Sequence, residues 1–350
     1  MIVDDSAVVR GLLARSLEPE PDITVVSTAM HGQMALKRLK TEPVEVVILD
    51  VEMPVMDGLE TLNRIQQDFP AVRVIMASTL TCKGAETTVR ALSLGAAACV
   101  AKPTAENLAA SIKQLRKELI PLVRAIGGKS QSPAETPEDS AFITRNTRPG
   151  PPRVPPQLIV IGSSTGGPNA LKTVLTGLPT DFAVPIAIVQ HMPPHFTAML
   201  AKHIAQDTGR ECREVVHGQP IQRGNTYVAP GDYHFLIDKQ GDRMVAVVNQ
   251  DPPEHFCRPS VNPLFRSASE WYRTSVLGVV LTGMGDDGIE GAGALVEQGG
   301  CVIAQDEASS VVWGMPGAVA RAGLAHRVLP LDAVAGTILE FCQRKSAIPA

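Results

Sequence analysis

Residues 158–167 read LIVIGSSTGG, an apolar and β-branched run that ends in a turn of glycine and small polar residues. Three such runs in the second half of the chain predict buried parallel strands: Leu158–Ile161, Val184–Gln190 and Val276–Leu281. In a doubly wound α/β sheet, the loops that follow parallel strands share one edge. We therefore expect Ser164, His191 and Asp287, which each follow one of these runs, to meet at that edge.

A hydroxyl, an imidazole and a carboxylate in contact are the constellation of a serine hydrolase. Ser164 fits the G-x-S-x-G nucleophile elbow, whose glycines permit a tight strand-to-helix turn and expose backbone N–H groups to developing negative charge. A structural or phosphate-binding turn is the alternative interpretation of the same residues. Spacing does not decide whether Asp286 or Asp287 orients the histidine.

Other residues offer rival sites in the same half of the chain. An α/β-hydrolase places its histidine after the acid, as His326 would be, but His326 precedes the apolar run Val328–Leu329 and is expected at the opposite sheet edge. His191 and His195 have a metal-type spacing, yet two prolines separate them and no cysteine or carboxylate lies near in sequence. The glycine-rich turn around Asp287 could also bind a cation.

The composition describes an ordinary soluble protein: 350 residues, 44% hydrophobic, 19% charged, long enough for two domains. A net charge of −4 and only 4% aromatic residues argue against nucleic acid as a partner. The start MIVDDSAVVR is neither a signal peptide nor a membrane span, which predicts a cytoplasmic protein without membrane insertion. The six cysteines show no metal-type pairing and are expected to be reduced and mostly buried.

A proline-rich stretch, GGKSQSPAETPEDSAFITRNTRPGPPRVPP, separates two α/β halves and predicts a linker. The predicted boundaries are a first domain over 1–122, a linker over 123–156 and a second domain over 157–346. The second half predicts a doubly wound, mostly parallel α/β domain with an antiparallel hairpin, His234–Ile237 and Met244–Val248, joined by Asp238–Arg243.

The first half alternates strand and helix, which predicts a doubly wound (βα)5 parallel sheet with helices on both faces. The predicted strands are Ile2–Val3, Thr24–Ala29, Val46–Leu49, Arg73–Met76 and Cys99–Ala101. The predicted helices are Ser6–Leu17, Gly32–Lys40, Leu59–Asp68, Gly84–Leu94 and Ala105–Leu122.

Polar residues follow the first, third, fourth and fifth of these strands: Asp4 and Asp5, then Asp50, Ser78 and Lys102. Three carboxylates at one sheet edge repel one another, and Mg²⁺ is the hard cation that such oxygen ligands suit. One carboxylate could then attack a phosphoryl donor while Lys102 holds the added oxygens, and Ser78 could bind the new phosphoryl group. The alternative is that these acids are solvated caps and turn residues.

The motifs VDDS, LDVEMPVMDG, MAST and AKP, in this order, resemble a response-regulator receiver domain over residues 1–122. The resemblance implies Asp50 as phosphoacceptor, Asp4 and Asp5 as support for Mg²⁺, and a histidine kinase as phosphoryl donor. Receivers usually carry more residues before the end of the first strand, whereas Met1 stands almost inside it here. We therefore expect a short first strand.

Six further motifs resemble the catalytic domain of the chemotaxis protein-glutamate methylesterase (CheB) family over residues 157–345: GSSTGG, QHMPPHFT, YVAPGDYH, RPSVNPLF, LTGMGDDG and QDEASSVVWGMPGA. The resemblance implies Ser164 as nucleophile, His191 as general base, Asp287 as orienting carboxylate and the N–H of Met284 as oxyanion donor. Alanine is commoner in the family at the position of Ser163, a change expected to matter little.

The implied reaction is cofactor-free hydrolysis of glutamyl methyl esters on cytoplasmic helices of chemoreceptors, with deamidation of receptor glutamines as a second activity. We further expect the receiver to cover the catalytic edge until Asp50 is phosphorylated. Two rival interpretations are a small-molecule esterase of the α/β-hydrolase type and a non-enzymatic response regulator whose GSSTGG loop binds a nucleotide.

Overall fold

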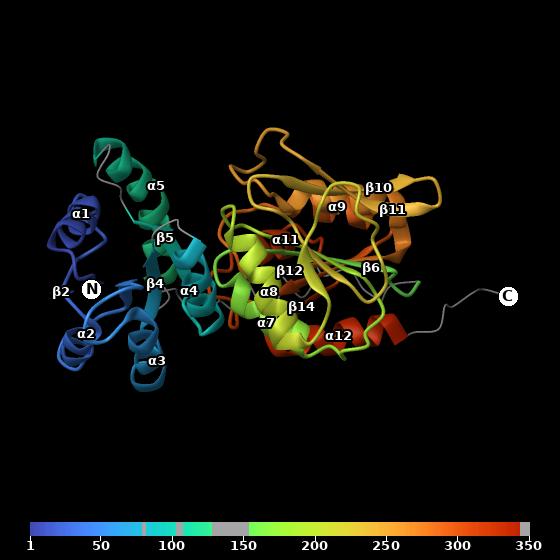
Figure 1. Ribbon diagram of the computed structural model, residues 1–350. Helices are drawn as coiled ribbons and strands as arrows, with labels where there is room; N and C mark the ends of the chain where they lie inside the picture. The colour runs from blue at the N-terminus through green and yellow to red at the C-terminus, as the bar shows by residue number, and fades with distance from the viewer. Residues whose placement is uncertain (79–81, 103–107, 128–153, 344–350) are drawn as a thin grey trace. The chain divides into compact units, whose positions relative to one another are not determined.

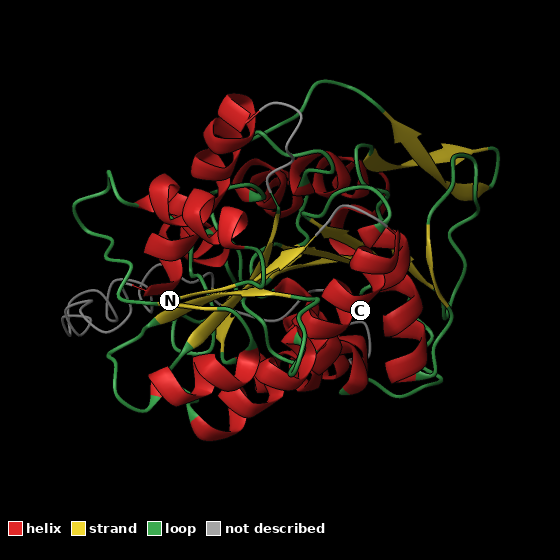
Figure 2. Cartoon of the chain, turned by 60° about the vertical axis from the view of Figure 1, so that its left-hand side comes forward, coloured by secondary structure: helices red, strands yellow, loops and turns green. Residues whose placement is uncertain are grey.

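Each half of the chain builds its own parallel sheet with helices on both faces, in a computed structural model of the protein (Figures 1 and 2). The structure describes residues 1–78, 82–102, 108–127 and 154–343. The chain divides into two compact units, Met1–Pro133 and Ala134–Ala350. Most of the predicted linker lies outside the described residues.

The first unit alternates strand and helix along the chain. Its strands are β1 (Ile2–Val3), β2 (Thr28–Ala29), β3 (Val46–Asp50), β4 (Arg73–Ser78) and β5 (Ala98–Ala101). Its helices are α1 (Ala7–Leu17), α2 (Gly32–Leu39), α3 (Gly58–Asp68), α4 (Cys82–Ser93) and α5 (Leu108–Gly127). The parallel order β2-β1-β3-β4-β5 confirms the predicted doubly wound sheet. Its switch point lies between β1 and β3, where ligand sites of such sheets are found.

Strand β2 is shorter than the predicted strand Thr24–Ala29, and the cause is its neighbour. The ladder joins Ile2 to Thr28 and Val3 to Ala29, so the two residues of β1 limit β2 to two. The short first strand is confirmed, and both of its residues are 1% exposed.

Helix α5 continues past the predicted end at Leu122 to Gly127. Ile126, which is 2% exposed, lies one helical turn beyond Leu122 and extends the buried face of the helix. The predicted start at Ala105 lies outside the described residues.

The second unit is built on a seven-stranded parallel sheet with a separate two-stranded one. Its strands are β6 (Leu158–Ser163), β7 (Ile186–Gln190), β8 (Cys212–Glu214), β9 (Thr226–Val228), β10 (His234–Gln240), β11 (Arg243–Asn249), β12 (Val276–Val280), β13 (Cys301–Gln305) and β14 (Arg327–Leu329). Its helices are α7 (Gly167–Thr176), α8 (Phe196–Thr208), α9 (Val261–Tyr272), the short η3 (Arg273–Ser275), α10 (Ile289–Glu297), α11 (Met315–Arg321) and α12 (Leu331–Gln343).

The seven parallel strands follow the order β14-β13-β12-β6-β7-β9-β8. The chain starts at β6, moves outward through β7, and later returns to β12 on the other side of β6. The switch point therefore lies between β6 and β12, and three predicted strands, β6, β7 and β12, are neighbours there. This confirms the doubly wound prediction for this unit.

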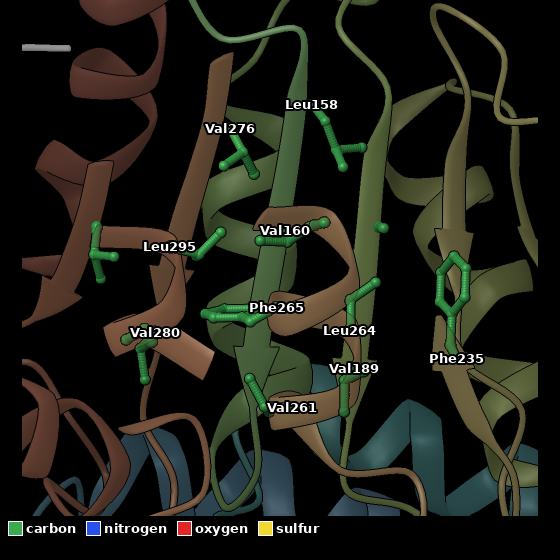
Figure 3. Packing of buried hydrophobic residues seen from close by; sticks show 14 of the residues in the cluster. Leu158, Val160, Val189, Phe235, Val261, Leu264, Phe265, Val276, Val280 and Leu295 are labelled. Atoms are coloured by element: carbon green, nitrogen blue, oxygen red, sulfur yellow. The ribbon is translucent and has the colours of Figure 1, made fainter. Parts of the chain in front are cut away.

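Helix α9 ties the core to the edge of the sheet that carries the predicted site. Figure 3 shows Val261, Leu264 and Phe265 of α9 lying over the strands that carry Val160 and Val189. All five side chains are fully buried, and burial of a side chain of this size stabilises a fold by roughly 1.5–3 kcal/mol. This packing fixes the first residues of α9 at the carboxyl edge of β6.

The predicted antiparallel hairpin is confirmed as β10 and β11, but its strands are longer than predicted. The predicted loop Asp238–Arg243 is wrong, because Asp238 pairs with Val245 and Gln240 with Arg243. The polar residues that suggested a loop are strand residues near the exposed tip of the hairpin. The turn is reduced to two residues, the first of which, Gly241, has φ +62°.

Among the described residues, five cysteines are free: Cys99, Cys212, Cys257, Cys301 and Cys342. The expectation that they are mostly buried is wrong, since only Cys301 is buried and the other four are partly exposed. Within the described part of the chain, no helix has the length and apolar character that a membrane span requires.

Candidate active site

The turn between β6 and α7 holds Ser164 at the switch point of the second sheet. Its backbone N–H donates to the carbonyl of Thr282, 3.0 Å away, which follows β12. Gly166, the N-cap of α7, has φ +79°, a conformation that favours glycine. Gly283 lies against Ser164, because a Cβ on Gly283 would be 2.8 Å from the Ser164 Cβ. Two glycines thus give the serine its position.

Gln190, the last residue of β7, fastens the same turn to the neighbouring strand. Its Nε2 donates to the carbonyl of Ser164 at 2.9 Å, and its Oε1 accepts from the Ser163 hydroxyl at 2.7 Å. The next residue, His191, donates its backbone N–H to the Ser163 carbonyl at 3.1 Å. These bonds place the backbones of the serine turn and of His191 side by side.

His191 and Asp287, ninety-six positions apart, form an ion pair at this edge. The Nε2 of His191 lies 2.8 Å from Oδ2 of Asp287, and Asp287 is only 2% exposed. The structure therefore brings together the predicted imidazole and the predicted carboxylate. Because Nε2 faces the acid, Nδ1 is the ring nitrogen that remains for a nucleophile.

The first residues of α9 hold the Asp287 carboxylate. Its Oδ2 accepts the backbone N–H of Val261 at 2.7 Å, and its Oδ1 accepts the hydroxyl of Ser260 at 2.8 Å and the N–H of Asn262 at 3.3 Å. A helix N-terminus stabilises negative charge through its backbone N–H groups, which have no partner within the helix. Ser260, the N-cap residue, turns its hydroxyl to the carboxylate, so that Asp287 caps the helix from another loop.

The adjacent Asp286 has a different environment. It is exposed, and its Oδ1 lies 2.8 Å from Nδ1 of His255. Asp287 points inward to the helix and to His191, whereas Asp286 points outward. Only Asp287 has the geometry of an orienting acid.

Cys257 is the residue that sequence reasoning missed. Its Sγ lies 3.5 Å from Nδ1 of His191, although the two residues are 66 positions apart in the sequence. Among the described residues, no hydrogen bond joins the Ser164 hydroxyl to the ring in this structure. The thiol occupies the nitrogen that the serine would need. Cys257 stands in an irregular loop, where no periodicity predicts a contact with a distant strand.

His191 and Asp287 shift each other's pKa. Burial alone would lower the pKa of His191, but hydrogen bonds to Asp287 and Cys257 raise it to about 10. Burial would raise the pKa of Asp287, but the bonds from His191, Val261 and Ser260 bring it below its ordinary value. The pair is thus ionised at neutral pH as long as the thiol remains at Nδ1.

The rival histidines lie elsewhere. His326 immediately precedes β14, at the opposite sheet edge, and its Nδ1 accepts the N–H of Val302 at 3.2 Å. His195 is exposed with φ +72°. Within the described residues, the only group of three or more potential metal ligands is in the first unit. Neither the histidine pair nor the turn around Asp287 belongs to such a group among the described residues.

Several backbone N–H groups beside Ser164 are available to a developing oxyanion. Those of Met284, Thr165 and Gly166 have no acceptor among the described residues. Met284 follows Gly283, which lies against the serine, and the other two belong to the start of α7. Sequence reasoning identified Met284 and, in general terms, the N–H groups of the glycine-rich turn.

The first unit gathers its predicted polar residues at the switch point between β1 and β3. Oxygens of Asp4, Asp5 and Asp50 lie within 4.8 Å of one another. Asp4 and Asp50 are buried, and Lys102 reaches both, at 2.9 Å and 2.6 Å. Ser78 ends β4, and its hydroxyl donates to the carbonyl of Gly84 at 3.4 Å.

The electrostatics of this acidic cluster fit a hard cation. Burial raises the pKa of Asp50, the charge of Asp4 adds to the shift, and the hydrogen bond from Lys102 opposes it. The Oδ2 atom of Asp50 is buried without a hydrogen-bond partner in the described part of the chain. An oxygen in that state beside two further carboxylates suits Mg²⁺, which prefers carboxylate ligands.

Comparison with known families identifies both units of the chain. Residues 159–338 match the CheB methylesterase family, and residues 1–113 match the response regulator receiver domain. The chain belongs to the CheB methylesterase family. It carries a receiver domain in its first unit and a CheB catalytic domain in its second.

Other members of the CheB methylesterase family resemble the chain over nearly its whole length. "Protein-glutamate methylesterase/protein-glutamine glutaminase 2" of Caulobacter vibrioides is 49% identical over 95% of this chain and 96% of its own. The corresponding protein 1 of Paramagnetospirillum magneticum is 46% identical, over 99% and 96%. The crystal structure of the Thermotoga maritima CheB methylesterase catalytic domain matches with TM-score 0.52 and 37% identity, over 53% of this chain and 99% of that one.

Proposed function

We propose that the chain is a phosphorylation-regulated protein-glutamate methylesterase that hydrolyses methyl esters of glutamate side chains on chemoreceptors and also deamidates receptor glutamines. One observation carries the proposal: the His191–Asp287 pair lies beside the Ser164 turn. The names of the relatives supply the substrate class. They fit neither a small-molecule esterase nor a nucleotide-binding regulator without enzymatic activity.

In the proposed reaction, the Ser164 hydroxyl oxygen bonds to the side-chain carbonyl carbon of the glutamyl ester. His191 accepts the serine proton at Nδ1, while Asp287 holds Nε2 and stabilises the imidazolium. The bond to the methoxy oxygen then breaks, and methanol leaves with the proton from Nδ1. Water, deprotonated by the same nitrogen, attacks the acyl-enzyme and releases the glutamate and the serine hydroxyl.

The thiol of Cys257 must give up Nδ1 before this reaction can begin. Its contact raises the pKa of His191, and a protonated ring cannot accept the serine proton. When the Ser164 hydroxyl replaces the thiol at Nδ1, the contribution of Cys257 to the pKa of His191 is removed. We infer that the described geometry is a resting arrangement of the site.

The negative charge of the tetrahedral intermediate needs donors that are already in place. The N–H of Met284 is our choice for this role, because Gly283 brings it to Ser164 and it has no acceptor among the described residues. The free N–H groups at the start of α7 add positive potential from the other side.

In the receiver domain we propose Asp50 as the phosphoacceptor, with a histidine kinase as donor. Asp4, Asp5 and Asp50 would hold Mg²⁺, which would neutralise the oxygens of the incoming phosphoryl group. Lys102 supplies a further positive charge at the same place, and Ser78, at the end of β4, would bind the new phosphoryl group and shift the loop that follows it. We place the protein in the cytoplasm, where the receptor helices that bear the esters are reached without membrane insertion.

Methanol release from methylated receptor membranes tests the proposal. Wild-type protein should release methanol, and faster with a small-molecule phosphoryl donor present. Ser164→Ala and His191→Ala should abolish release while His326→Ala leaves it unchanged. Full activity in Ser164→Ala, or loss only in His326→Ala, would show that the site is assigned wrongly.

A further inference from the structure

A tight turn at residues 254–257, beside the proposed catalytic residues, has a strained backbone. The backbone N–H of Cys257 donates to the carbonyl of Glu254 at 2.8 Å, and the reverse bond is 3.2 Å. The two residues between them, His255 and Phe256, have φ +48° and +62°. A turn with two left-handed residues ordinarily takes glycine or asparagine there, because a Cβ is strained in that region. Strain of this kind concentrates at functional sites.

Side-chain contacts fasten the turn to the catalytic edge. Cys257 lies against His191, and His255 bonds to Asp286, the neighbour of the orienting acid. At the start of the turn, Glu254 pairs with Arg266 of α9, with one bond of 2.9 Å. These contacts attach the turn to His191, to the neighbour of Asp287 and to helix α9.

The turn presents a large aromatic residue to solvent. Phe256 is 95% exposed, more than any other large apolar residue among those described. The loop between β11 and α9 that carries it lies at the outer border of the second unit (Figure 1). Holding an aromatic ring in water on a strained, tethered backbone lowers the stability of the folded protein. Aromatic residues are, however, the usual anchors of protein–protein interfaces.

We propose that Phe256 is the anchor through which the catalytic domain engages the substrate helix next to the glutamyl ester. The inference rests on the proposed function, since it presumes that the ester is carried by a helix of another protein. Phe256 directly precedes Cys257, whose thiol touches His191. In the proposed complex, with the ester seated at Ser164, the ring would contact the adjacent turn of the same helix. An apolar side chain three or four positions from the esterified glutamate would be its partner.

The experiment compares two substrates in the full-length protein. Methanol release is measured from methylated receptor membranes and from the soluble γ-methyl ester of blocked glutamate. In Phe256→Ala, KM for the membranes should rise about tenfold or more, as expected for loss of an aromatic anchor. The change for the soluble ester should be at least several-fold smaller. Phe256→Leu, which keeps an apolar side chain, should restore most of the loss.

Two controls separate anchoring from folding. Val216→Ala shortens another exposed apolar side chain, 63% exposed and outside the turn, and should change neither KM. Phe256→Gly relaxes the φ of +62°, so it should unfold at a higher temperature than Phe256→Ala but show the same rise in KM. Labelling of Ser164 by a fluorophosphonate reports on the catalytic residues if the soluble ester is turned over too slowly.

Three outcomes would contradict the proposal that Phe256 is an anchor. The first is an unchanged membrane KM in Phe256→Ala with normal activity in wild type. The second is an equal loss for both substrates, which would make the turn a support of the catalytic residues alone. The third is a higher rate without phosphoryl donor, which would mean that the ring docks the receiver domain of the same chain. Absence of methanol release by wild-type protein would instead refute the proposed function itself.

Discussion

The two switch points of this molecule treat a buried aspartate in opposite ways. Asp287 in the catalytic domain receives backbone N–H groups, a hydroxyl and an imidazole, and its pKa lies below the ordinary value. Asp50 in the receiver has Lys102 but keeps a buried oxygen without a partner among the described residues, and its pKa lies above the ordinary value. The fold itself supplies hydrogen-bond partners for the carboxylate of Asp287. The carboxylate of Asp50 still has an oxygen that needs a further partner.

This difference matches the two proposed tasks. An acid that orients a histidine must stay charged and fixed through every catalytic cycle, so it is best satisfied by the protein itself. A phosphoacceptor must keep an oxygen available for bond formation, and a fully hydrogen-bonded carboxylate would be a poor nucleophile. In this proposal the same sheet edge would serve as a permanent site in one domain and as a switch in the other.

The largest effect should come from Asp287→Asn. The amide cannot stabilise an imidazolium, and kcat for methanol release should fall by about 10⁴-fold. The folded protein should also lose stability, because the N–H groups of α9 lose a charged acceptor. Asp286→Asn is the matched control one residue away, exposed and directed to His255, and it should keep most of the activity. Equal losses in both variants would contradict the assignment of the acid.

Asp50→Asn should have the opposite effect on stability. A carboxyl whose folded pKa is raised binds its proton more tightly when folded, so its ionisation costs stability as pH rises through that pKa. At neutral pH the variant should therefore melt higher, by about 4 °C for each 1 kcal/mol regained in a domain of this size. It should also lose activation by a phosphoryl donor.

Mg²⁺ should stabilise the wild-type protein in the same melting experiment and have less effect on Asp50→Asn. Asp57→Asn is a suitable control, because Asp57 is an exposed N-cap of α3 that asparagine can replace. An equal response to Mg²⁺ in wild type and Asp50→Asn would contradict the interpretation of the acidic cluster.

The pH profile of activity should separate the contribution of the Cys257 thiol to the pKa of His191 from that of Asp287. Activity requires the neutral ring, so the acid limb of kcat/KM follows the pKa of His191. Cys257→Ala removes one of the two hydrogen bonds that raise this pKa and should move the limb to lower pH. Cys257→Ser, which can still bond to Nδ1, should move it less. A limb that stays in place in Cys257→Ala would show that the thiol does not occupy Nδ1 in solution.

The smallest effect should come from Ser163→Ala. The variant removes the 2.7 Å bond to Oε1 of Gln190, at a cost of about 1 kcal/mol in the free energy of unfolding. The second bond of Gln190, to the carbonyl of Ser164, remains and should keep the turn in place. Urea unfolding measures the loss, and methanol release should change by less than about threefold, the factor for roughly 0.6 kcal/mol. A larger loss of activity would show that the single remaining bond does not hold the nucleophile.

Much of the fold was predictable because both sheets consist of buried parallel strands, which appear in the sequence as uninterrupted apolar runs. The switch-point rule then predicts which edge carries chemistry, and Asp50, Ser164 and His191 each follow such a run. Strand length was less predictable, since β2 is limited by its partner β1 and not by its own residues.

Side-chain partners from other elements could not be predicted in the same way. Asp286 and Asp287 share one turn, and the difference between them arises from the start of α9, which is distant in sequence. The contact between Cys257 and His191 depends on a tight turn of non-glycine residues with positive φ, which local sequence preferences argue against. Such contacts follow from tertiary packing and not from periodicity.

The central claim is that the His191–Asp287 pair activates Ser164, and reaction of the intact protein with a fluorophosphonate tests it most directly. Peptide mass spectrometry should find the adduct on Ser164 in the wild-type protein and in Cys257→Ala, and only traces in His191→Ala and Asp287→Asn. An adduct on Cys257, or labelling of Ser164 that does not depend on His191, would contradict the account.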